Sequence, residues 1–509
     1  MGKTIVKKAK PVMLQGTSSH VGKSVLTAAL CRILWRRGFS VAPFKAQNMA
    51  LNSSVTADGG EIGRAQAFQA EAAGILPTVD LNPVLLKPTG DSVSQVIIHG
   101  RVYGSMSAVE YHAFKKDVRK YVLESYRRLE RAYDVIVIEG AGSPAEINLR
   151  KNDIANMGVA RLAKSPVLIV GDIDRGGVFA SIVGTMELLT EDERKRVKGF
   201  LINKFRGDSS LLTPAIDYLE GRTGAPVLGV IPYLKDISLP DEDGVALDAE
   251  KKAGAGASEI EIAVVKLPRI SNFTDFDPFK GSLSVAVRFV ESPEDITGAD
   301  MVILPGTKNT LEDLLWLKNR GFEGALKRHL KRGGFLAGIC GGFQMLGACV
   351  KDPNGVESGR KAVPGLGIME ASTVLMKEKS TFQVEAEAGF PGERPFKVKG
   401  YEIHMGETRG KAGPFARITR RNSKRVSIED GACSPDGAVW GTYIHGIFDN
   451  DLFRREVIGR MRMKKGLAGR GACTSYLSMR ESAIDSVASA VEENVRMDDI
   501  LRIIGVGKG

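Results

Sequence analysis

Short runs of apolar, mostly β-branched residues alternate with stretches of helical periodicity through the first half of the chain. This alternation is typical of parallel strands joined by crossover helices. Leucine and isoleucine side chains between residues 26 and 34 share one helical face, and Gly38 follows them as a stop signal. The pattern predicts strands at residues 11–15, 39–43, 134–139, 166–171, 199–203 and 227–232.

A small, charged and glycine-rich stretch, AEKKAGAGASE, interrupts this pattern and predicts a linker. A second alternating series follows it. Near the end of the chain, valine and isoleucine recur at helical spacing and predict a helix that ends before Gly505. The strands predicted in the second series are residues 262–266, 283–288, 301–304, 335–338 and 438–444. We therefore expect an α/β protein made of a first domain (1–248), a linker (249–260), a second domain (261–455) and a C-terminal helical tail packed on the second domain (456–509).

The composition is that of a folded protein, with 43% hydrophobic and 26% charged residues among 509. The net charge of +11 favours anionic partners such as nucleotides, polycarboxylates or nucleic acid. The basic clusters at residues 327–332 and 417–425 lack the interleaved aromatic residues on which single-stranded nucleic acid stacks. We therefore expect no nucleic-acid partner.

Cysteine usage and hydropathy indicate the compartment. The five cysteines have no CxxC spacing, which argues against both a disulfide framework and a structural zinc site and favours a reducing environment. The basic N-terminal segment is not followed by an apolar signal core, and no apolar run reaches the roughly 18 residues of a membrane span. We expect a cytoplasmic protein without a membrane partner, and the sequence leaves its oligomeric state open.

The segment GTSSHVGKS follows the first predicted strand and precedes the first predicted helix. It is one residue longer than the standard P-loop, because five residues separate Gly16 from Gly22. Backbone N–H groups at Gly16, Thr17 and Gly22 are expected to point at phosphate oxygens, whose charge Lys23 would neutralise. The alternative, a plain glycine turn, leaves the succession of Lys23 and Ser24 unexplained.

Oxygen ligands for Mg²⁺ are predicted near this loop. Ser24 offers a hydroxyl, and Glu139 ends the apolar strand in DVIVIEGAGS at the same edge of the sheet. Asp58, in TADGGEIGRAQ, is a further candidate, although a surface acid that caps a helix explains it equally well. Asn203 ends a predicted strand, where its side-chain amide is expected to hydrogen-bond the adenine base. The alternative is an ordinary asparagine at a strand end. We predict ATP and Mg²⁺ as cofactors and no tightly bound prosthetic group.

The segment GICGG places Cys340 between a predicted strand and a predicted helix. In such an elbow, small neighbours let a nucleophile project from a sharp turn, and the next backbone N–H, at Gly341, points at an oxyanion. Gly306, in LPGTKNT, is predicted to complete the oxyanion hole, unless the segment is a simple turn. A cysteine that only packs in a core is the alternative for Cys340, and its glycine neighbours weaken that alternative.

A nucleophilic cysteine needs a base that takes and returns its proton. His445, in WGTYIHGIFD, follows an apolar strand and precedes Gly446, which suits a base carried on a loop. His404, in KGYEIHMGET, is a competing base that the sequence does not exclude. Together, the phosphate loop and the cysteine predict an enzyme that activates an acid with ATP and supplies it with nitrogen taken from glutamine.

Further segments resemble the cobyric acid synthases, the glutamine-dependent amidotransferases of cobalamin biosynthesis, over nearly the whole chain. The first half is also similar to dethiobiotin synthetase, whose phosphate loop has the same extra residue, and the second half to class I glutamine amidotransferases. The usual His-Pro-Glu end of the class I triad is replaced by His445, Gly446 and Ile447, so no third triad member is assigned. The matching segments are FKAQNMALNS (44–53), DGGEIGRAQ (58–66), NPVLLKP (82–88), EGAGSPAEINL (139–149), DIDRGGVFAS (172–181), LINKFRGD (201–208) and PRISNFTDFDP (268–278).

The resemblance implies successive amidation of the b, d, e and g carboxylates of adenosylcobyrinic acid a,c-diamide. Each carboxylate would become an acyl phosphate in the first, ATP-binding domain, and glutamine would release ammonia at Cys340 in the second. The candidates for holding the corrinoid follow predicted strand ends, and they are residues 45–53, Lys87 and residues 146–148. The alternatives are the sister enzyme, cobyrinic acid a,c-diamide synthase, and a non-enzymatic P-loop switch protein.

Overall fold

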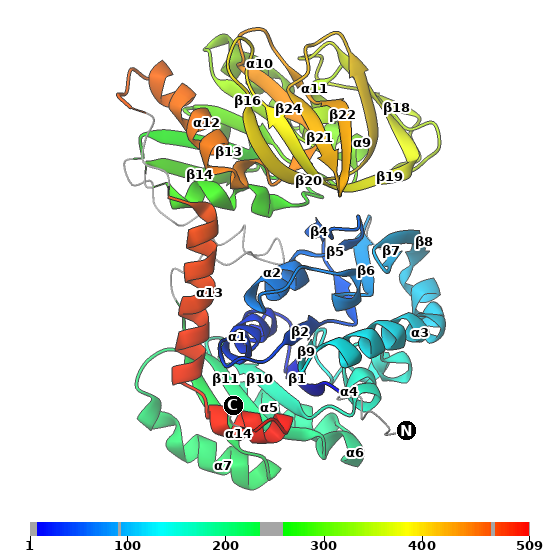
Figure 1. The fold of residues 1–509 in the computed structure, drawn as a ribbon, viewed down its shortest axis with the longest axis vertical. Coiled ribbons are helices and arrows are strands. Elements are labelled where there is room, and N and C mark those ends of the chain that lie inside the picture. The colour runs from blue at the N-terminus through cyan, green and yellow to red at the C-terminus, as the bar shows by residue number, and fades with distance from the viewer. Residues whose placement is uncertain (1–7, 90–92, 235–257, 283, 470–473, 508–509) are drawn as a thin grey trace, which may run out of the picture.

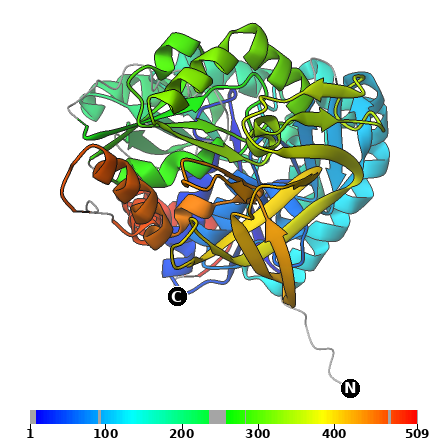
Figure 2. The ribbon, with the colours of Figure 1, turned by 90° about the horizontal axis from the view of Figure 1, so that it is seen from above.

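The computed structural model describes residues 8–89, 93–234, 258–282, 284–469 and 474–507. Two lobes are stacked along the long axis in Figure 1, and Figure 2 looks down on the second lobe with the first beneath it. The first lobe holds residues 8–234 and the second residues 258–469. Residues 249–257 of the predicted linker lie outside the described residues.

The first lobe is built on a six-stranded parallel sheet in the order β12–β11–β10–β1–β9–β2. Every strand predicted for the first half of the chain belongs to this sheet, so the prediction of a parallel α/β domain is confirmed. The strands are β1 (Lys10–Gly16), β2 (Val41–Phe44), β9 (Val135–Glu139), β10 (Val167–Asp172), β11 (Val197–Phe205) and β12 (Val227–Pro232).

Helices cover both faces of this sheet, as parallel strands with crossover connections require. One apolar core joins α3, α4, α5 and α7 to one face, and a second core joins α1 to the other. The helices of the first lobe are α1 (Lys23–Arg36), α2 (Arg64–Ala72), α3 (Ala108–Ala132), α4 (Met157–Ala163), α5 (Val178–Leu188), α6 (Glu191–Arg194) and α7 (Thr213–Thr223).

Short strands that the sequence analysis did not predict form the end of the first lobe that faces the second lobe (Figure 1). Four of them make a sheet in the order β3–β6–β7–β8, and β4 pairs with β5 in a hairpin. Their bounds are β3 (Gln47–Met49), β4 (Ser53–Val55), β5 (Glu61–Gly63), β6 (Val84–Pro88), β7 (Val93–Ile98) and β8 (Arg101–Ser107).

The second lobe has a sheet in the order β14–β13–β15–β16–β24–β23, parallel except for β23. Each predicted strand of the second series overlaps one of its strands. The strands are β13 (Ile260–Val265), β14 (Val285–Val290), β15 (Met301–Leu304), β16 (Phe335–Ile339), β23 (Ala432–Cys433) and β24 (Val439–Thr442). The helices are α9 (Thr310–Asn319), α10 (Phe322–Lys331), α11 (Gly341–Leu346) and α12 (Asp451–Lys464).

A mixed sheet with a long antiparallel hairpin, β19–β20, lies beside the parallel one and was not predicted. Its last strand, β25, carries His445, so this sheet helps to position the candidate base. The strands are β17 (Cys349–Lys351), β18 (Ala362–Pro364), β19 (Ala371–Ala388), β20 (Phe396–Gly410), β21 (Ala416–Arg421), β22 (Lys424–Asp430) and β25 (Ile444–His445).

The C-terminal tail contacts both lobes. Helix α12 packs against β13 and β20 of the second lobe, whereas the predicted tail (456–509) was expected to pack there throughout. Helices α13 (Tyr476–Glu493) and α14 (Met497–Ile504) instead bury Val487 and Leu501 in the core around β1 and α1 of the first lobe. For these two helices the prediction was wrong, because a 3.6-residue apolar period shows that a helix buries one face but not which sheet receives it.

Tyr401 and Ile403 of β20 pack on Val55 of β4 in an apolar cluster that joins the lobes. The backbone N–H of Ser53 donates to Asn272 across the interface at 2.9 Å, and the Tyr401 hydroxyl donates to the Ser53 carbonyl at 3.2 Å. These contacts hold the β4–β5 hairpin against the second lobe. No helix in the described part of the chain is long and apolar enough to cross a membrane.

Candidate active site

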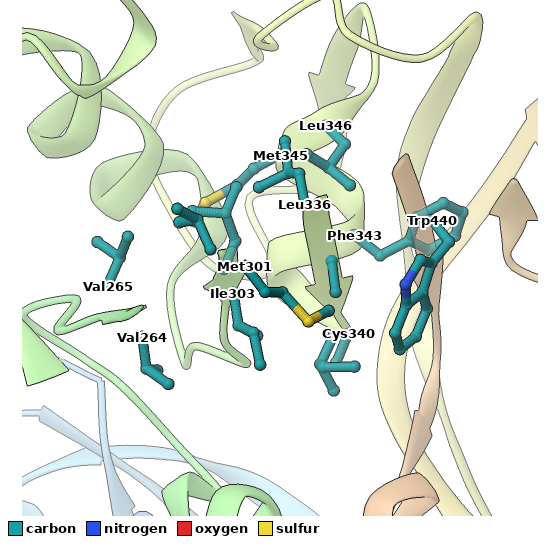
Figure 3. Packing of buried hydrophobic residues seen from close by; sticks show 14 of the residues in the cluster. Val264, Val265, Met301, Ile303, Leu336, Cys340, Phe343, Met345, Leu346 and Trp440 are labelled. Carbon is teal, nitrogen blue, oxygen red and sulfur yellow. The ribbon is translucent and has the colours of Figure 1, made fainter. Parts of the chain in front are cut away.

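Cys340 occupies the turn between β16 and α11, with φ of 53° and ψ of −109°. A non-glycine residue with positive φ is strained, and a nucleophile elbow typically holds its nucleophile in this way. The backbone fixes the turn, because the N–H of Cys340 donates to Thr442 at 2.8 Å and its carbonyl accepts from the N–H of Gln344 at 3.1 Å. In Figure 3 the cysteine lies at the edge of a cluster of buried apolar side chains that includes Ile303 and Phe343.

His445 and Cys340 line the same pocket; the thiol donates to the Ile403 carbonyl at 3.8 Å and is among the groups that raise the pKa of the imidazole. The imidazole Nδ1 lies 2.6 Å from Oδ2 of Asp275, and Oδ1 of Asp275 accepts from the N–H of Gly446 at 3.1 Å. The Nε2 atom lies 3.5 Å from the amide nitrogen of Asn272. A thiol, an imidazole and a carboxylate are therefore arranged in succession, in the order that a cysteine nucleophile requires.

Burial of His445 opposes its protonation, but Asp275 and then Cys340 outweigh that effect and raise the pKa of the imidazole to about 10. The raised pKa means that the site stabilises an imidazolium. The neutral imidazole therefore takes a proton from the thiol readily, and the imidazolium that forms can return it to a leaving amine.

His404 also reaches the pocket, but its ring is held by other partners. Its Nδ1 lies 2.8 Å from the carbonyl of Gly406 and its Nε2 lies 3.4 Å from Glu402, which Arg421 holds through two hydrogen bonds. The ring is stacked on Tyr443, with centroids 3.8 Å apart. Of the two candidate bases, the geometry favours His445.

The predicted oxyanion segments lie against each other. A Cβ atom at Gly341 would come within 2.7 Å of the Thr307 side chain and 3.2 Å of its backbone nitrogen. Glycine at 341 therefore lets the elbow approach the 306–307 turn closely. A Cβ atom at Gly306 would lie 3.1 Å from the His445 ring, so both glycines border the cysteine and histidine. Their role as oxyanion donors stays a prediction.

Asp275 is the member of this group that the sequence analysis did not assign. It lies in a 3₁₀ helix, η5 (Phe273–Gly281), 170 positions before His445 in the chain. It belongs to PRISNFTDFDP, one of the segments that carried the family resemblance. That segment could have suggested Asp275, but its contact with the imidazole depends on the tertiary fold.

We expect Asp275→Asn to lower glutamine hydrolysis by roughly 10²-fold or more, because the asparagine cannot stabilise the imidazolium or fix its tautomer. With the carboxylate gone, burial dominates and the pKa of His445 should fall from about 10 towards or below its ordinary value of about 6.5. Hydrolysis rates and NMR titration of the imidazole resonances would measure both effects.

Asp277→Asn is the matched control, because Asp277 lies two residues further along the same 3₁₀ helix and pairs with Lys280 at 3.1 Å. It should leave both the rate and the imidazole titration close to those of the parent protein. An Asp275→Asn protein in which His445 still titrates near pH 10 would show that another group raises the pKa.

The phosphate loop joins β1 to α1, and hydrogen bonds to backbone carbonyls hold its lysine and support its backbone. The Lys23 ammonium donates to the carbonyls of Ser18 and Gly142, both at 3.0 Å, so it lies across the loop. The amide of Asn203 donates to the Val21 carbonyl at 2.8 Å. Asn203 therefore supports the loop from β11, and its predicted contact with adenine stays a prediction.

Glu139 is the centre of a polar cluster below this loop. Its Oε1 accepts from the Ser24 hydroxyl at 2.8 Å and from the Lys45 ammonium at 2.9 Å, and its Oε2 accepts from the amide of Gln69 at 2.5 Å. A hydroxyl and a carboxylate at this separation are the hard oxygen donors that Mg²⁺ binds beside phosphate oxygens, so Ser24 and Glu139 fit the predicted ion. The sequence placed Lys45 among the corrinoid candidates and did not single out Gln69, because only the fold brings them to Glu139.

The structure does not bring Asp58 into this cluster. Asp58 is exposed in the turn between β4 and β5, where it accepts a hydrogen bond from the Thr56 hydroxyl. The neighbouring Gly59 approaches Thr381 of the second lobe. Asp58 thus lies at the lobe interface, which leaves Ser24 and Glu139 as the metal candidates.

Two protein-family models match the chain. A CobQ/CobB/MinD/ParA nucleotide-binding domain matches residues 12–247, and a CobB/CobQ-like glutamine amidotransferase domain matches residues 261–453. The nucleotide-binding model covers the phosphate loop and Glu139, and the amidotransferase model covers Cys340, His445 and Asp275.

Relatives named cobyric acid synthase are similar over the full length. The protein from Moorella thermoacetica is 51% identical over 98% of this chain and 98% of its own. The protein from Sorangium cellulosum is 52% identical over 98% of this chain and 99% of its own, and that from Pelotomaculum thermopropionicum is 50% identical over 98% and 97%. The chain therefore belongs to the cobyric acid synthase family of glutamine-dependent amide-forming ligases.

Proposed function

We propose that this enzyme amidates the b, d, e and g carboxylates of adenosylcobyrinic acid a,c-diamide, using ATP and the amide nitrogen of glutamine. The observation that carries the proposal is the identity of 50–52% to cobyric acid synthases along 97–98% of the chain. The presence of a phosphate loop and a cysteine elbow in one chain supports it. The net charge of +11 suits a polycarboxylate and a nucleotide.

The nitrogen comes from the second lobe. The sulfur of Cys340 attacks the side-chain amide carbon of glutamine, and the thiol proton moves to His445. His445, whose imidazolium Asp275 stabilises, then gives the proton to the departing nitrogen, so ammonia leaves and a thioester remains. Water hydrolyses the thioester to glutamate and restores the thiol. Backbone N–H groups near Gly306 and Gly341 stabilise the oxyanion in both steps.

The acid is activated in the first lobe. A corrinoid carboxylate oxygen attacks the γ-phosphorus of ATP, ADP leaves, and an acyl phosphate forms. The loop at Gly16, Thr17 and Gly22 holds the phosphates by backbone N–H groups, and Lys23 neutralises charge on the transferred group. Ser24 and Glu139 would hold Mg²⁺, which supplies further charge neutralisation when bound. Ammonia then attacks the acyl carbon and releases phosphate.

We further infer a reducing, cytoplasmic location, because the mechanism needs a free thiol at Cys340. Cys31, Cys340, Cys349 and Cys433 are free, and Cys473 lies outside the described residues. A thiolate nucleophile would be lost to oxidation in an oxidising compartment.

The proposal is tested with the purified protein, ATP, Mg²⁺, glutamine and cobyrinic acid a,c-diamide in its adenosyl form. Mass spectrometry should resolve four successive conversions of carboxyl to amide, each matched by one ADP and one glutamate. If the protein leaves this acceptor unchanged but amidates cobyrinic acid itself, it is a cobyrinic acid a,c-diamide synthase. If neither acceptor changes and ATP is still hydrolysed, the P-loop switch is the better description.

A further inference from the structure

Five charged side chains meet in the wall of the pocket that contains the candidate nucleophile. Three belong to the second lobe, namely Lys308, Glu357 and Lys379, and all three line the pocket. Lys87 of β6 reaches the pocket from the first lobe, and Glu61 of β5 lies directly behind it. This polar wall is therefore built by both lobes.

Three of the five side chains compensate one another. The Lys87 ammonium binds Oε1 of Glu61 at 2.7 Å, and Lys379 binds Oε2 of the same carboxylate. All three side chains are at most 8% exposed. Burial alone would raise the pKa of Glu61, but Lys379, Lys87 and then Lys308 hold it below its usual range. The trio therefore carries a net positive charge inside the interface.

Lys308 and Glu357 are less well compensated. The Lys308 ammonium donates to the neutral amide of Gln95 at 3.1 Å, and Glu357 accepts from the backbone N–H of Thr310 at 2.6 Å. In the described residues neither side chain forms a salt bridge. Burial, Lys379 and Lys87 push the pKa of Lys308 well below its ordinary value, and burial raises the pKa of Glu357 to about 7.

Both side chains are half-buried, and both shifts have the sign expected of a charge that is partly removed from water and forms no close ion pair. A small zwitterion would supply both missing charges at once. The substrate predicted for this pocket is one, since free glutamine carries an α-carboxylate and an α-ammonium three carbons away from the amide that Cys340 attacks. Charge-assisted hydrogen bonds at these groups would select it from other amides.

We propose that Lys308 binds the α-carboxylate of glutamine and that Glu357 binds its α-ammonium, so that the two side chains select free glutamine at the cysteine pocket. This inference rests on the proposed function, because it assumes that the pocket hydrolyses glutamine. Gln95, from β7 of the first lobe, positions the Lys308 ammonium. Both lobes therefore contribute to the recognition of the nitrogen donor.

The test compares three amides with the full-length enzyme: L-glutamine, 4-aminobutanamide, which lacks the α-carboxylate, and 4-carbamoylbutanoate, which lacks the α-ammonium. Ammonia release gives kcat/KM for each. The parent protein should prefer glutamine over both analogues. Lys308→Met should lower kcat/KM for glutamine by roughly 30-fold or more, mainly through KM, and should reduce the preference over 4-aminobutanamide by a similar factor.

Glu357→Gln keeps an acceptor for Thr310 and should reduce only the preference over 4-carbamoylbutanoate. Lys331→Met, at an exposed lysine of α10, is the control and should change neither preference. Lys308→Gln serves if the methionine variant does not fold, as judged by its thermal melting curve. Variants that lower the rates of all three amides equally, with the preferences intact, would overturn the inference. A parent protein that releases ammonia from none of the amides would instead overturn the proposed function.

Discussion

Cys340→Ala should abolish amidation driven by glutamine while amidation driven by an ammonium salt continues. The alanine cannot form the thioester, so glutamine hydrolysis should fall by at least about 10³-fold, the scale lost when a nucleophile is removed. The phosphate loop lies in the other lobe, so ammonia from solution can still displace phosphate from the acyl phosphate. Corrinoid mass and glutamate release, measured with each nitrogen source, would separate the two activities.

Cys349→Ala is the control for this variant, because Cys349 is a free, partly exposed thiol in β17. It should retain activity with both nitrogen sources. A Cys340→Ala protein that melts like the parent and loses both activities would contradict the division of labour between the lobes.

Lys23→Met should have the opposite pattern, with both glutamine-driven and ammonia-driven amidation lowered by at least about 10²-fold. The methionine fills a similar volume but cannot neutralise the charge that develops on the transferred phosphoryl group. Glutamine hydrolysis should persist, because Lys23 does not line the cysteine pocket, whose nucleophile and base belong to the second lobe. ADP formation, amide formation and glutamate release would be measured in parallel.

Lys195→Met provides the comparison, since Lys195 is an exposed lysine of the same lobe that pairs with Glu191, four residues before it. Its activities should match those of the parent protein. Normal amidation by the Lys23→Met protein would mean that the loop does not hold the transferring phosphate.

The parallel sheets and the two candidate centres could be predicted from sequence because their signals are local. Apolar runs separated by helical periods specify buried parallel strands, and GTSSHVGKS and GICGG each carry their chemistry within nine residues or fewer. The sequence did not exclude His404 as the base; the contact of His445 with Asp275 and its place in the pocket of Cys340 favour His445.

The elements that were missed depend on contacts between distant segments. Asp275 reaches His445 across 170 positions, and Lys45 reaches Glu139 across 94. The strand β19 combines an alternating segment with the charged run at residues 377–379, which conceals its period of two. A sequence window does not show which lobe receives a helix, which is why α13 and α14 were placed on the wrong one.

The path of these two helices restricts how the lobes can move. The chain passes from the first lobe to the second between β12 and β13, and it returns between α12 and α13. These two covalent connections keep the lobes close to each other throughout the catalytic cycle, so each lobe experiences a high effective concentration of the other. Because α12 packs on the second lobe while α13 packs on α1 of the first, full separation of the lobes would break one of these helix contacts, so the corrinoid should enter and leave while the lobes stay joined.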